Sequence, residues 1–375
     1  MVAKAKGVTL KSIAERAGCS ITLVSKTLNN AKGSAGAGPK AQQRILRIAR
    51  KLGYRANYHA RALQTGRTHT LGFVSRLESG RHHGNHYWGQ LIQGVECGAR
   101  AANHDLLIIG PAGGRSEIER GIECLREKRI DALIVPTAMY GHTLSQLEAI
   151  AAPIVFVADP LPDSHPGVGI ELRPGIRQAF GHLASLGHGK VLWSPLKARG
   201  TITDGERNAE VKAAARDAGV TLRIAPIDLD AVADPTSVEP FVEACRQQFA
   251  EYLRRHTPCS AALAYSERVA MGLYAALADV GLSVPRDVSV VSFDDIYAHA
   301  TMPPMTVVSI RLDAVGEKAA ALALEMALGS KPLKAVLDGF QFSGILALAD
   351  GNPYSGGTSG NPTPSGIQGG LLGVG

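Results

Sequence analysis

The chain has 375 residues, of which 45% are hydrophobic and 19% charged, a composition typical of a globular protein with about two to three domains. The net charge of +7 is unevenly placed, because residues 1–67 carry fourteen Lys and Arg against one acid, Glu15, which leaves −6 on the rest of the chain. No apolar run is long enough for a membrane span or a secretory signal, so we expect a cytoplasmic protein with no membrane partner.

The basic N-terminal segment predicts two short helices separated by a tight turn. Thr9 is the expected N-cap of a helix over residues 10–17, and Gly18 is expected to end that helix in the left-handed region. Ser20 then caps a second helix over residues 21–29. Two helices at this spacing are typical of a helix-turn-helix, which in a strongly basic segment predicts DNA binding.

The second of these helices predicts two different faces. Ile21, Val24 and Leu28 are spaced i, i+3 and i+7, and we expect them to face a small core. The opposite face carries short polar or basic side chains that can reach base edges and phosphates in a major groove, namely Thr22, Ser25, Lys26 and Asn29. The alternative is a helical bundle with a solvated polar face, and the charge of the segment favours DNA binding.

Two further helices are expected before residue 67. One has Pro39 in its first turn and ends at Gly53, and its apolar side chains are those of Ile45, Ile48, Ala49 and Leu52. The other covers Asn57–Gln64, and at about eight residues it is too short to be stable alone in water. We therefore expect the helix over Asn57–Gln64 to form only with help from a partner.

Past residue 67, short apolar runs alternate with amphipathic stretches, which is typical of parallel sheets covered on both faces. In the first half we expect strands over 70–74, 106–109, 132–135 and 154–157 and helices over 87–102, 116–127 and 144–151. After a Pro- and Gly-rich passage we expect helices over 174–186, 204–218, 238–255 and 267–280 and strands over 191–193, 222–225, 261–264 and 288–293. Two similar halves predict two lobes with a ligand-binding cleft between them.

The last 25 residues differ from the rest of the chain. Residues 351–375 contain nine Gly, three Pro and no charged residue, so they cannot bury enough surface to order themselves. We expect a flexible tail and assign it no function. It offers no apolar heptad for a larger assembly, so a homodimer is the default expectation.

Patterns that would carry enzyme or metal chemistry are incomplete. The five cysteines are scattered without a C-x-x-C pair, which predicts neither a disulfide framework nor a zinc site. His82, His83 and His86 lie in a loop that lacks the frame of a metal site, so we expect no metal. Residues 187–190 resemble a phosphate loop but lack its first Gly and its final Ser or Thr, and we expect a helix-to-strand turn there. Without a Gly-x-Ser-x-Gly elbow or a dinucleotide loop, we expect no cofactor and no enzyme activity.

Several motifs make the chain resemble the LacI/GalR family of bacterial transcription regulators. They are residues 8–29 (VTLKSIAERAGCSITLVSKTLN), 52–57 (LGYRAN) and 281–295 (GLSVPRDVSVVSFDD), with shorter matches at 60–63, 65–68, 71–74, 186–188 and 303–306. The resemblance covers residues 8–349. It implies a body similar to periplasmic sugar-binding proteins, a homodimer, a palindromic double-stranded DNA operator and a small-molecule effector in the cleft.

The resemblance also implies roles for individual residues of the head. Ile21, Thr22 and Lys26 match base-reading positions, and the phosphate-contacting positions match Thr9, Ser20, Ser25 and Asn29. The segment Asn57–Gln64 matches a hinge helix that enters the minor groove, where Asn57, Ala60 and Leu63 are the candidate contacts and Leu63 is the wedge that opens a base step. The loop at 30–38 is about three residues longer than is usual, and Ala56 stands where proline is common.

An effector pocket is implied in the same way. Tyr87 and Trp88 match aromatic positions whose flat rings stack on a sugar or base. The matching polar positions are Asp159, Arg207 and Asp294. The Asn-Asp pair that usually follows the strand at 261–264 is here Ser266-Glu267, which changes the hydrogen-bond reach, and Ser266 is kept as a candidate.

Together these observations predict an N-terminal all-α helix-turn-helix domain plus an α/β two-lobed periplasmic-binding-protein-like body with doubly wound parallel sheets. The expected domains are 1–56 for DNA binding, 57–67 for the hinge helix and linker, 68–350 for effector binding and dimerisation, and 351–375 for the tail. The expected function is a sequence-specific repressor of a catabolic operon, controlled by a small polar effector, a sugar. The alternatives are a solute-binding protein, which the basic head opposes, and a sugar-metabolising enzyme, which would need a catalytic pair.

Overall fold

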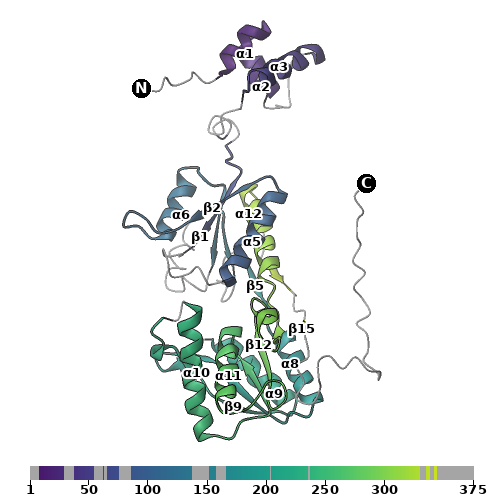
Figure 1. Ribbon diagram of the computed structural model, residues 1–375. Coiled ribbons are helices and arrows are strands. Elements are labelled where there is room, and N and C mark those ends of the chain that lie inside the picture. The colour runs from purple at the N-terminus through teal and green to yellow at the C-terminus, as the bar shows by residue number, and fades with distance from the viewer. Residues whose placement is uncertain are drawn as a thin grey trace. The chain divides into compact units, whose positions relative to one another are not determined.

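The computed structural model (Figure 1) describes residues 8–28, 38–54, 62, 66–75, 86–136, 152–157, 166–202, 204–234, 237–329, 335–337 and 342–343. The chain divides into two compact units, the first made of Met1–Gly80, Trp88–Ile170 and Leu312–Leu337 and the second of Arg81–Tyr87, Glu171–Arg311 and Asp338–Gly375. Within the described ranges, no helix is long and apolar enough to cross a membrane. Several predictions lie outside these ranges, namely the helix at 144–151, the hinge helix, His82 and His83 of the histidine loop, and the C-terminal tail. His86, predicted to lie in the same loop, is instead the first residue of a helix.

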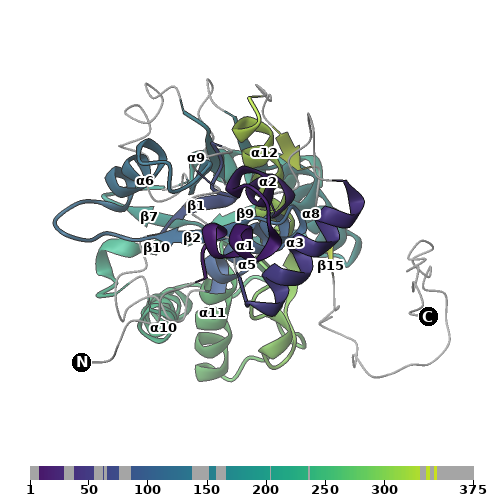
Figure 2. The same cartoon turned by 90° about the horizontal axis from the view of Figure 1, so that it is seen from above.

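Three helices form the N-terminal domain (Figures 1 and 2): α1 (Leu10–Ala17), α2 (Ile21–Leu28) and α3 (Pro39–Lys51). Thr9 caps α1 as predicted: its Oγ1 accepts the N–H of Ser12 at 3.2 Å, and Ser12 Oγ accepts the N–H of Thr9 at 3.1 Å. Gly18 ends α1 with a φ of 59°, and Ser20 Oγ accepts the N–H of Leu23 at 3.2 Å in the first turn of α2. The helices enclose a small core of Ile13, Ala14, Ala17, Val24, Ile45 and Ala49.

The predicted core position of Ile21 is wrong. Its side chain is 47% exposed, whereas Val24 is fully buried and Leu28 packs against the core. Ile21 is the first residue of α2, and helical side chains lean toward the N-terminus of their helix, so this side chain extends past the end of a small core. Leu23 packs against the core instead. Ile21 therefore belongs to the exposed face of α2.

The sheet of the first unit is parallel throughout, with strand order β14-β5-β4-β3-β1-β2. Its strands are β1 (Thr70–Val74), β2 (Asp105–Ile109), β3 (Ala132–Pro136), β4 (Ile154–Val157), β5 (Gly167–Ile170) and β14 (Ala335–Leu337), and its helices are α5 (His86–Ala101), α6 (Glu117–Arg126) and α12 (Leu312–Ala327). Leu91, Val95 and Ala99, spaced four residues apart on one face of α5, are all buried.

The sheet of the second unit has the order β15-β13-β12-β11-β6-β9, and every pair except β13 with β15 is parallel. Its strands are β6 (Lys190–Ser194), β9 (Thr221–Ile224), β11 (Ala261–Ala264), β12 (Ser289–Phe293), β13 (Thr306–Val308) and β15 (Phe342–Ser343). One face packs against α8 (Arg173–Ser185) and α9 (Gly205–Asp217), and the other against α10 (Val238–Arg255) and α11 (Glu267–Asp279). The prediction of doubly wound parallel sheets is confirmed.

The two sheets share one topology. In each, the first strand of the unit lies between the second and the third, so that β9-β6-β11-β12-β13 repeats the order β2-β1-β3-β4-β5. The chain thus changes winding direction between β1 and β3 and again between β6 and β11. In open parallel sheets, ligands bind beside the carboxyl ends of the strands at such a reversal.

The prediction that the two lobes are consecutive halves of the chain is wrong, because α12 and β14 return to the first unit. The sequence pattern also missed β5, which lies in the Pro- and Gly-rich passage, and a small sheet of β7 (Leu196–Ala198), β8 (Thr201–Ile202) and β10 (Ile227–Asp228). Two- to four-residue strands are too short to show a period, and their partners come from distant parts of the chain.

Glycines let α12 approach α5 closely within the first unit. A Cβ atom added to Gly94 would overlap the backbone oxygen of Asp313, and one added to Gly316 would overlap the backbone oxygen of Leu91. A Cβ on Gly98 would lie 2.7 Å from that of Ala320. Backbone cannot move aside as a flexible side chain can, so the two helices depend on glycine here.

We expect Gly316→Ala to destabilise the protein by about 1–3 kcal/mol, because the new methyl group forces α5 and α12 apart. The denaturation midpoint in urea measures this change. The matched control is Gly181→Ala on the exposed side of α8, where no atom lies within 4 Å of the added Cβ. That control should stabilise by about 0.5–1 kcal/mol through helix propensity. Equal shifts of the two midpoints in the same direction would contradict the packing argument.

Candidate functional site

The exposed face of α2 is the first candidate site. Ile21, Thr22 and Lys26 are exposed, and Ser25 is half-buried beside them. At about 100° of rotation per residue, these four side chains cover a continuous strip of roughly 140° around the helix. Asn29, predicted to extend this strip, lies outside the described residues, as do Asn57, Ala60 and Leu63 of the predicted hinge.

The two cap residues lie at the positively polarised ends of their helices. The hydroxyls of Thr9 and Ser20 each accept a backbone N–H, at 3.2 Å in both cases. A hydroxyl that accepts a hydrogen bond still has its own hydrogen, which it can donate to a phosphate oxygen. Helix N-termini also favour anions. The geometry is therefore compatible with the phosphate-contacting roles predicted for both residues.

The third helix adds a row of exposed cations. They are Lys40, Arg44, Arg47, Arg50 and Lys51, on the side away from the buried Ile45 and Ala49. Several of these cations are three or four residues apart, a spacing at which like charges destabilise a helix. Glu15 is the single acid in residues 1–67. A polyanion such as DNA would relieve this repulsion.

The second candidate site lies at the carboxyl edge of the second sheet, where its winding reverses. Ala264 of β11 pairs in register with Ser194 of β6 and Ser292 of β12. Because these strands are parallel, the segments that follow them begin at the same edge. The structure thus brings together three predicted residues of this unit, namely Arg207, Ser266 and Asp294.

Arg207 is held within this edge by several contacts. Its Nε lies 3.0 Å from Asp204 Oδ2, and its Nη1 donates to the backbone oxygen of Tyr265 at 3.3 Å. The guanidinium carbon stacks 4.3 Å from the ring centroid of Tyr265 and 4.9 Å from that of Phe293. Tyr265 completes the group by donating its hydroxyl hydrogen to Asp204 Oδ2 at 3.4 Å. Arg207 is therefore a fixed cation rather than a freely moving one.

Asp294 follows β12 with a left-handed backbone, at a φ of 78°. Its N–H donates to the backbone oxygen of Val308 at 3.2 Å, which ties it to β13. Burial raises the pKa of the Asp294 carboxyl to about 6, although the guanidinium groups of Arg207 and Arg268 act in the opposite direction. A carboxylate with two cations nearby can accept hydrogen bonds from ligand hydroxyls.

Ser266 and Glu267 differ in how they are placed. Ser266 is the N-cap of α11 and is half-buried, and its side chain makes no cap hydrogen bond. Glu267 is only 1% exposed, and its Oε2 accepts the N–H groups of Ile296 and Tyr297, both at 2.9 Å. Burial raises the pKa of the Glu267 carboxyl to about 7, with a further contribution from the charge of Asp294.

The remaining effector candidates belong to other parts of the chain. Tyr87 and Trp88 lie in the first turn of α5; Trp88 is half-buried, and the side chain of Tyr87 lies outside the described residues, as does Asp159. Sequence reasoning missed the parts played by Tyr265, Asp204, Arg268 and Glu267. Three of them, Tyr265, Glu267 and Arg268, have one sequence signal, because they directly follow an apolar strand that ends at the switch point, and Asp204 has none.

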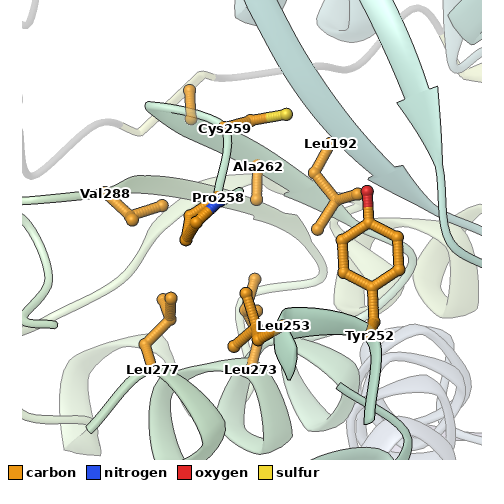
Figure 3. A pocket seen from close by; sticks show the side chains of 10 residues that line it. Leu192, Tyr252, Leu253, Pro258, Cys259, Ala262, Leu273, Leu277 and Val288 are labelled. Carbon is orange, nitrogen blue, oxygen red and sulfur yellow. The ribbon is translucent and has the colours of Figure 1, made fainter. Parts of the chain in front are cut away.

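A small pocket lies at the opposite, amino edge of the same sheet (Figure 3). It is lined by Leu192, Tyr252, Leu253, Pro258, Cys259, Ala261, Ala262, Leu273, Leu277 and Val288. Figure 3 shows mainly aliphatic side chains turned toward it, and none of the lining residues is charged. It does not suit a polar ligand, so the carboxyl edge remains the candidate. Within the described residues, no group of His, Cys, Asp or Glu could hold a metal ion.

Comparison with known proteins gives one family match and many relatives. Residues 180–337 match the periplasmic binding protein-like domain. The chain is 28% identical over 332 residues to the HTH-type transcriptional regulator GalS of Salmonella typhimurium, covering 88% of this chain and 92% of that protein. It is 27% identical over 317 residues to the HTH-type transcriptional regulator DegA of Bacillus subtilis, covering 82% and 88%. The ribose operon repressor of Escherichia coli is 25% identical over 318 residues, covering 83% and 90%.

Solved structures share the fold over most of the chain. A Lac repressor dimer bound to operator and the anti-inducer ONPF superposes with a TM-score of 0.67 at 20% identity, covering 86% of this chain and 94% of that one. A complex of the transcriptional regulator CelR with cellobiose gives a TM-score of 0.59 at 24% identity, covering 88% and 97%. The predicted fold class is confirmed by these matches.

We expect the stability of the protein to fall as the pH rises from about 4.5 to about 7, because the folded chain binds the Glu267 proton more tightly than the unfolded chain does. The raised pKa of Glu267 corresponds to a loss of about 3 kcal/mol, complete above pH 7. Glu267→Gln should lack this component, so its stability relative to wild type should improve between pH 5 and pH 8.

Urea unfolding at these two pH values measures the effect. The matched control is Glu239→Gln, which changes an exposed glutamate in the first turn of α10. This control should follow the wild-type pH dependence. If Glu267→Gln also followed it, the carboxyl would not be protonated in the folded protein at neutral pH.

Proposed function

The chain belongs to the LacI/GalR family of bacterial transcription regulators, and we propose that it is a repressor that binds a palindromic operator as a homodimer and responds to a small polar effector. The observation that carries this proposal is the exposed strip of α2 on a basic, capped helix-turn-helix. We propose that residues 1–56 bind DNA, that 57–67 form the hinge and that 68–350 bind effector and dimerise. Because its partner is chromosomal DNA, the protein acts in the cytoplasm.

The head binds DNA through three kinds of contact. Ile21, Thr22 and Lys26 read base edges in the major groove, because they are the exposed outward side chains of the recognition helix. Thr9, Ser20, Ser25 and Asn29 contact phosphates and fix the register. The hinge residues Asn57, Ala60 and Leu63 enter the minor groove at the centre of the operator, where Leu63 opens a base step.

The effector binds at the carboxyl edge of the second sheet. Asp294 accepts hydrogen bonds from ligand hydroxyls, and Arg207 and Ser266 supply further polar contacts. Tyr87, Trp88 and Asp159 supply the remaining proposed contacts to the effector. A sugar fits this set of groups, and the relatives include a ribose operon repressor and a regulator in complex with cellobiose.

Effector control follows from a difference in affinity between two arrangements of the lobes. A ligand shifts the dimer toward the arrangement that it contacts better, and this arrangement determines whether both hinge helices can form on DNA. Because the hinge helix has only about eight residues, it is marginal alone, and a modest bias is enough to control it.

An enzyme activity is the second candidate to weigh. Asp294 and Glu267 are two neighbouring carboxyl groups with raised pKa values, a pattern that also occurs in acid–base catalysis. However, Glu267 is 1% exposed and is engaged with backbone N–H groups, so it is not presented to a substrate. We therefore favour a binding site. A solute-binding protein would share the two sheets, but the helix-turn-helix head has no use in it.

Selection from a pool of random duplexes tests the proposal directly. We expect the purified full-length protein to enrich an inverted repeat, as a symmetric dimer requires. Lys26→Ala should weaken binding to this repeat by about 1–3 kcal/mol, or roughly 5- to 150-fold, and relax the preference at one base pair per half-site. The control Lys51→Ala, on α3, should leave the selected sequence unchanged. Failure of the wild type to enrich any repeat would refute the proposal.

The salt dependence of binding should be steep, because phosphate contacts release counterions. Titrations of a duplex at several salt concentrations give the slope of log affinity against log salt, which is about 0.9 per neutralised phosphate. Replacing Arg44, Arg47 and Arg50 together by Gln should reduce the slope by about one to three. Arg216→Gln, on the exposed side of α9, should not change it. Binding of the wild type that does not depend on salt would contradict this prediction.

A further inference from the structure

Glu267 makes contacts that its position in the helix does not require. It is the first residue of α11, where an acidic side chain ordinarily faces water and stabilises the helix dipole. Here the side chain is 1% exposed and turns to another segment, so that Oε2 accepts the N–H groups of Ile296 and Tyr297, both at 2.9 Å. Two N–H groups of one segment therefore share a single carboxylate oxygen.

The segment that receives these contacts begins with Asp294, the candidate effector ligand. It is held at its start by the hydrogen bond from Asp294 N–H to the backbone oxygen of Val308, at 3.2 Å. The next residue, Asp295, accepts a hydrogen bond from the hydroxyl of the buried Ser309. Both of these contacts tie the segment to the chain at the end of β13. Glu267 supplies the contact on the opposite flank, from α11 after β11.

A left-handed residue needs support from its surroundings. Asp294 has a φ of 78°, and a non-glycine residue keeps such a conformation only where neighbouring contacts hold it. Two successive N–H groups on its C-terminal side, those of Ile296 and Tyr297, donate to Glu267 Oε2. Loss of this acceptor would free the backbone on the C-terminal side of Asp294. The hydrogen bond from Asp294 N–H to Val308 at the end of β13 would remain.

We propose that Glu267 is a positioning residue of the effector site, which sets the direction of the Asp294 carboxylate by holding the backbone of residues 296–297 from the first turn of α11. The inference rests on the proposed function in so far as Asp294 is the ligand-binding group. Glu267 itself does not touch the effector. Its side chain is longer by one methylene group than an aspartate at the same position, and that length spans the distance from the helix to the segment.

The charges around Glu267 agree with a positioning role. The titratable groups around Asp294, on the segment that Glu267 holds, are Arg268 on the same helix as Glu267, Arg207 on α9 and Tyr265 at the end of β11. The charge of Asp294 contributes to the raised pKa of Glu267, so the two carboxyl groups repel each other electrostatically. With the proton on Glu267, the Asp294 carboxylate is the one negative charge of the pair and is free to bind a ligand.

Hydrogen exchange of the full-length, ligand-free protein tests the proposal. The readout is the exchange rate of a peptide that covers residues 294–298. Glu267→Ala removes the acceptor and should raise this rate about tenfold, as expected for the loss of hydrogen bonds worth at least 1.4 kcal/mol. Glu267→Gln keeps an acceptor oxygen at the same distance and should restore wild-type protection. Glu239→Gln, an exposed glutamate in the first turn of α10, should have no effect.

Glu267→Asp separates positioning from charge. It keeps the carboxyl group but shortens its reach, so exchange of the 294–298 peptide should rise as it does in the alanine variant. If Glu267→Ala does not fold, the comparison of the Asp and Gln variants gives the same answer. Rescue by Asp but not by Gln would overturn the proposal, because it would show that charge matters and reach does not. Wild-type exchange in both the Ala and Asp variants would overturn it as well.

The pH dependence adds a readout that a purely structural contact would not move. In Asp294→Asn the neighbouring charge is lost, so the pH midpoint of the Glu267-dependent stability change should move to lower pH. An unchanged midpoint would show that the two carboxyl groups do not interact, and would overturn the proposal. None of these measurements uses DNA, so failure to select an operator would refute the proposed function and leave the result on Glu267 intact.

Discussion

The candidate effector site depends on the in-register parallel pairing of β6, β11 and β12. Each pair of strands exchanges backbone hydrogen bonds from Ala261 to Ala264, and the pairing ends at the same level on all three strands. The polar segments that follow must then turn away from the sheet side by side. Their backbone groups need hydrogen-bond partners once they leave the sheet. The contacts from Glu267 to the segment after Asp294 meet that need.

The polar groups at this edge are close to electrostatic balance. Asp204 and Arg207 neutralise each other beside Tyr265, and Arg268 and Arg207 attract the charge of Asp294. Burial opposes every one of these charges. The same groups would serve poorly as a structural core, where aliphatic side chains of equal volume pack at lower cost.

The N-terminal helical head is stabilised by different interactions. Its core consists of a few small and branched side chains around Ile13 and Ile45, and capping at Thr9 and Ser20 contributes much of the local order. The charge on α3 works against that order. A domain that repels itself when free and gains partners on DNA couples its own stability to binding. The effector-sensing body, with its net negative charge, has no such attraction and leaves recognition to the head.

Sequence alone determined the local elements and their faces. Caps at Thr9 and Gly18 and apolar periods predicted the helices and most of the long strands, because these signals depend on neighbours within one or two turns. The tertiary structure decided what depends on distant partners: the exposure of Ile21, the return of α12 to the first unit, and the short strands of the small sheet. The tertiary structure also determined which residues form the candidate effector site. The pairing of β6 and β11 places Arg207 beside Tyr265, and no local sequence pattern predicts this contact.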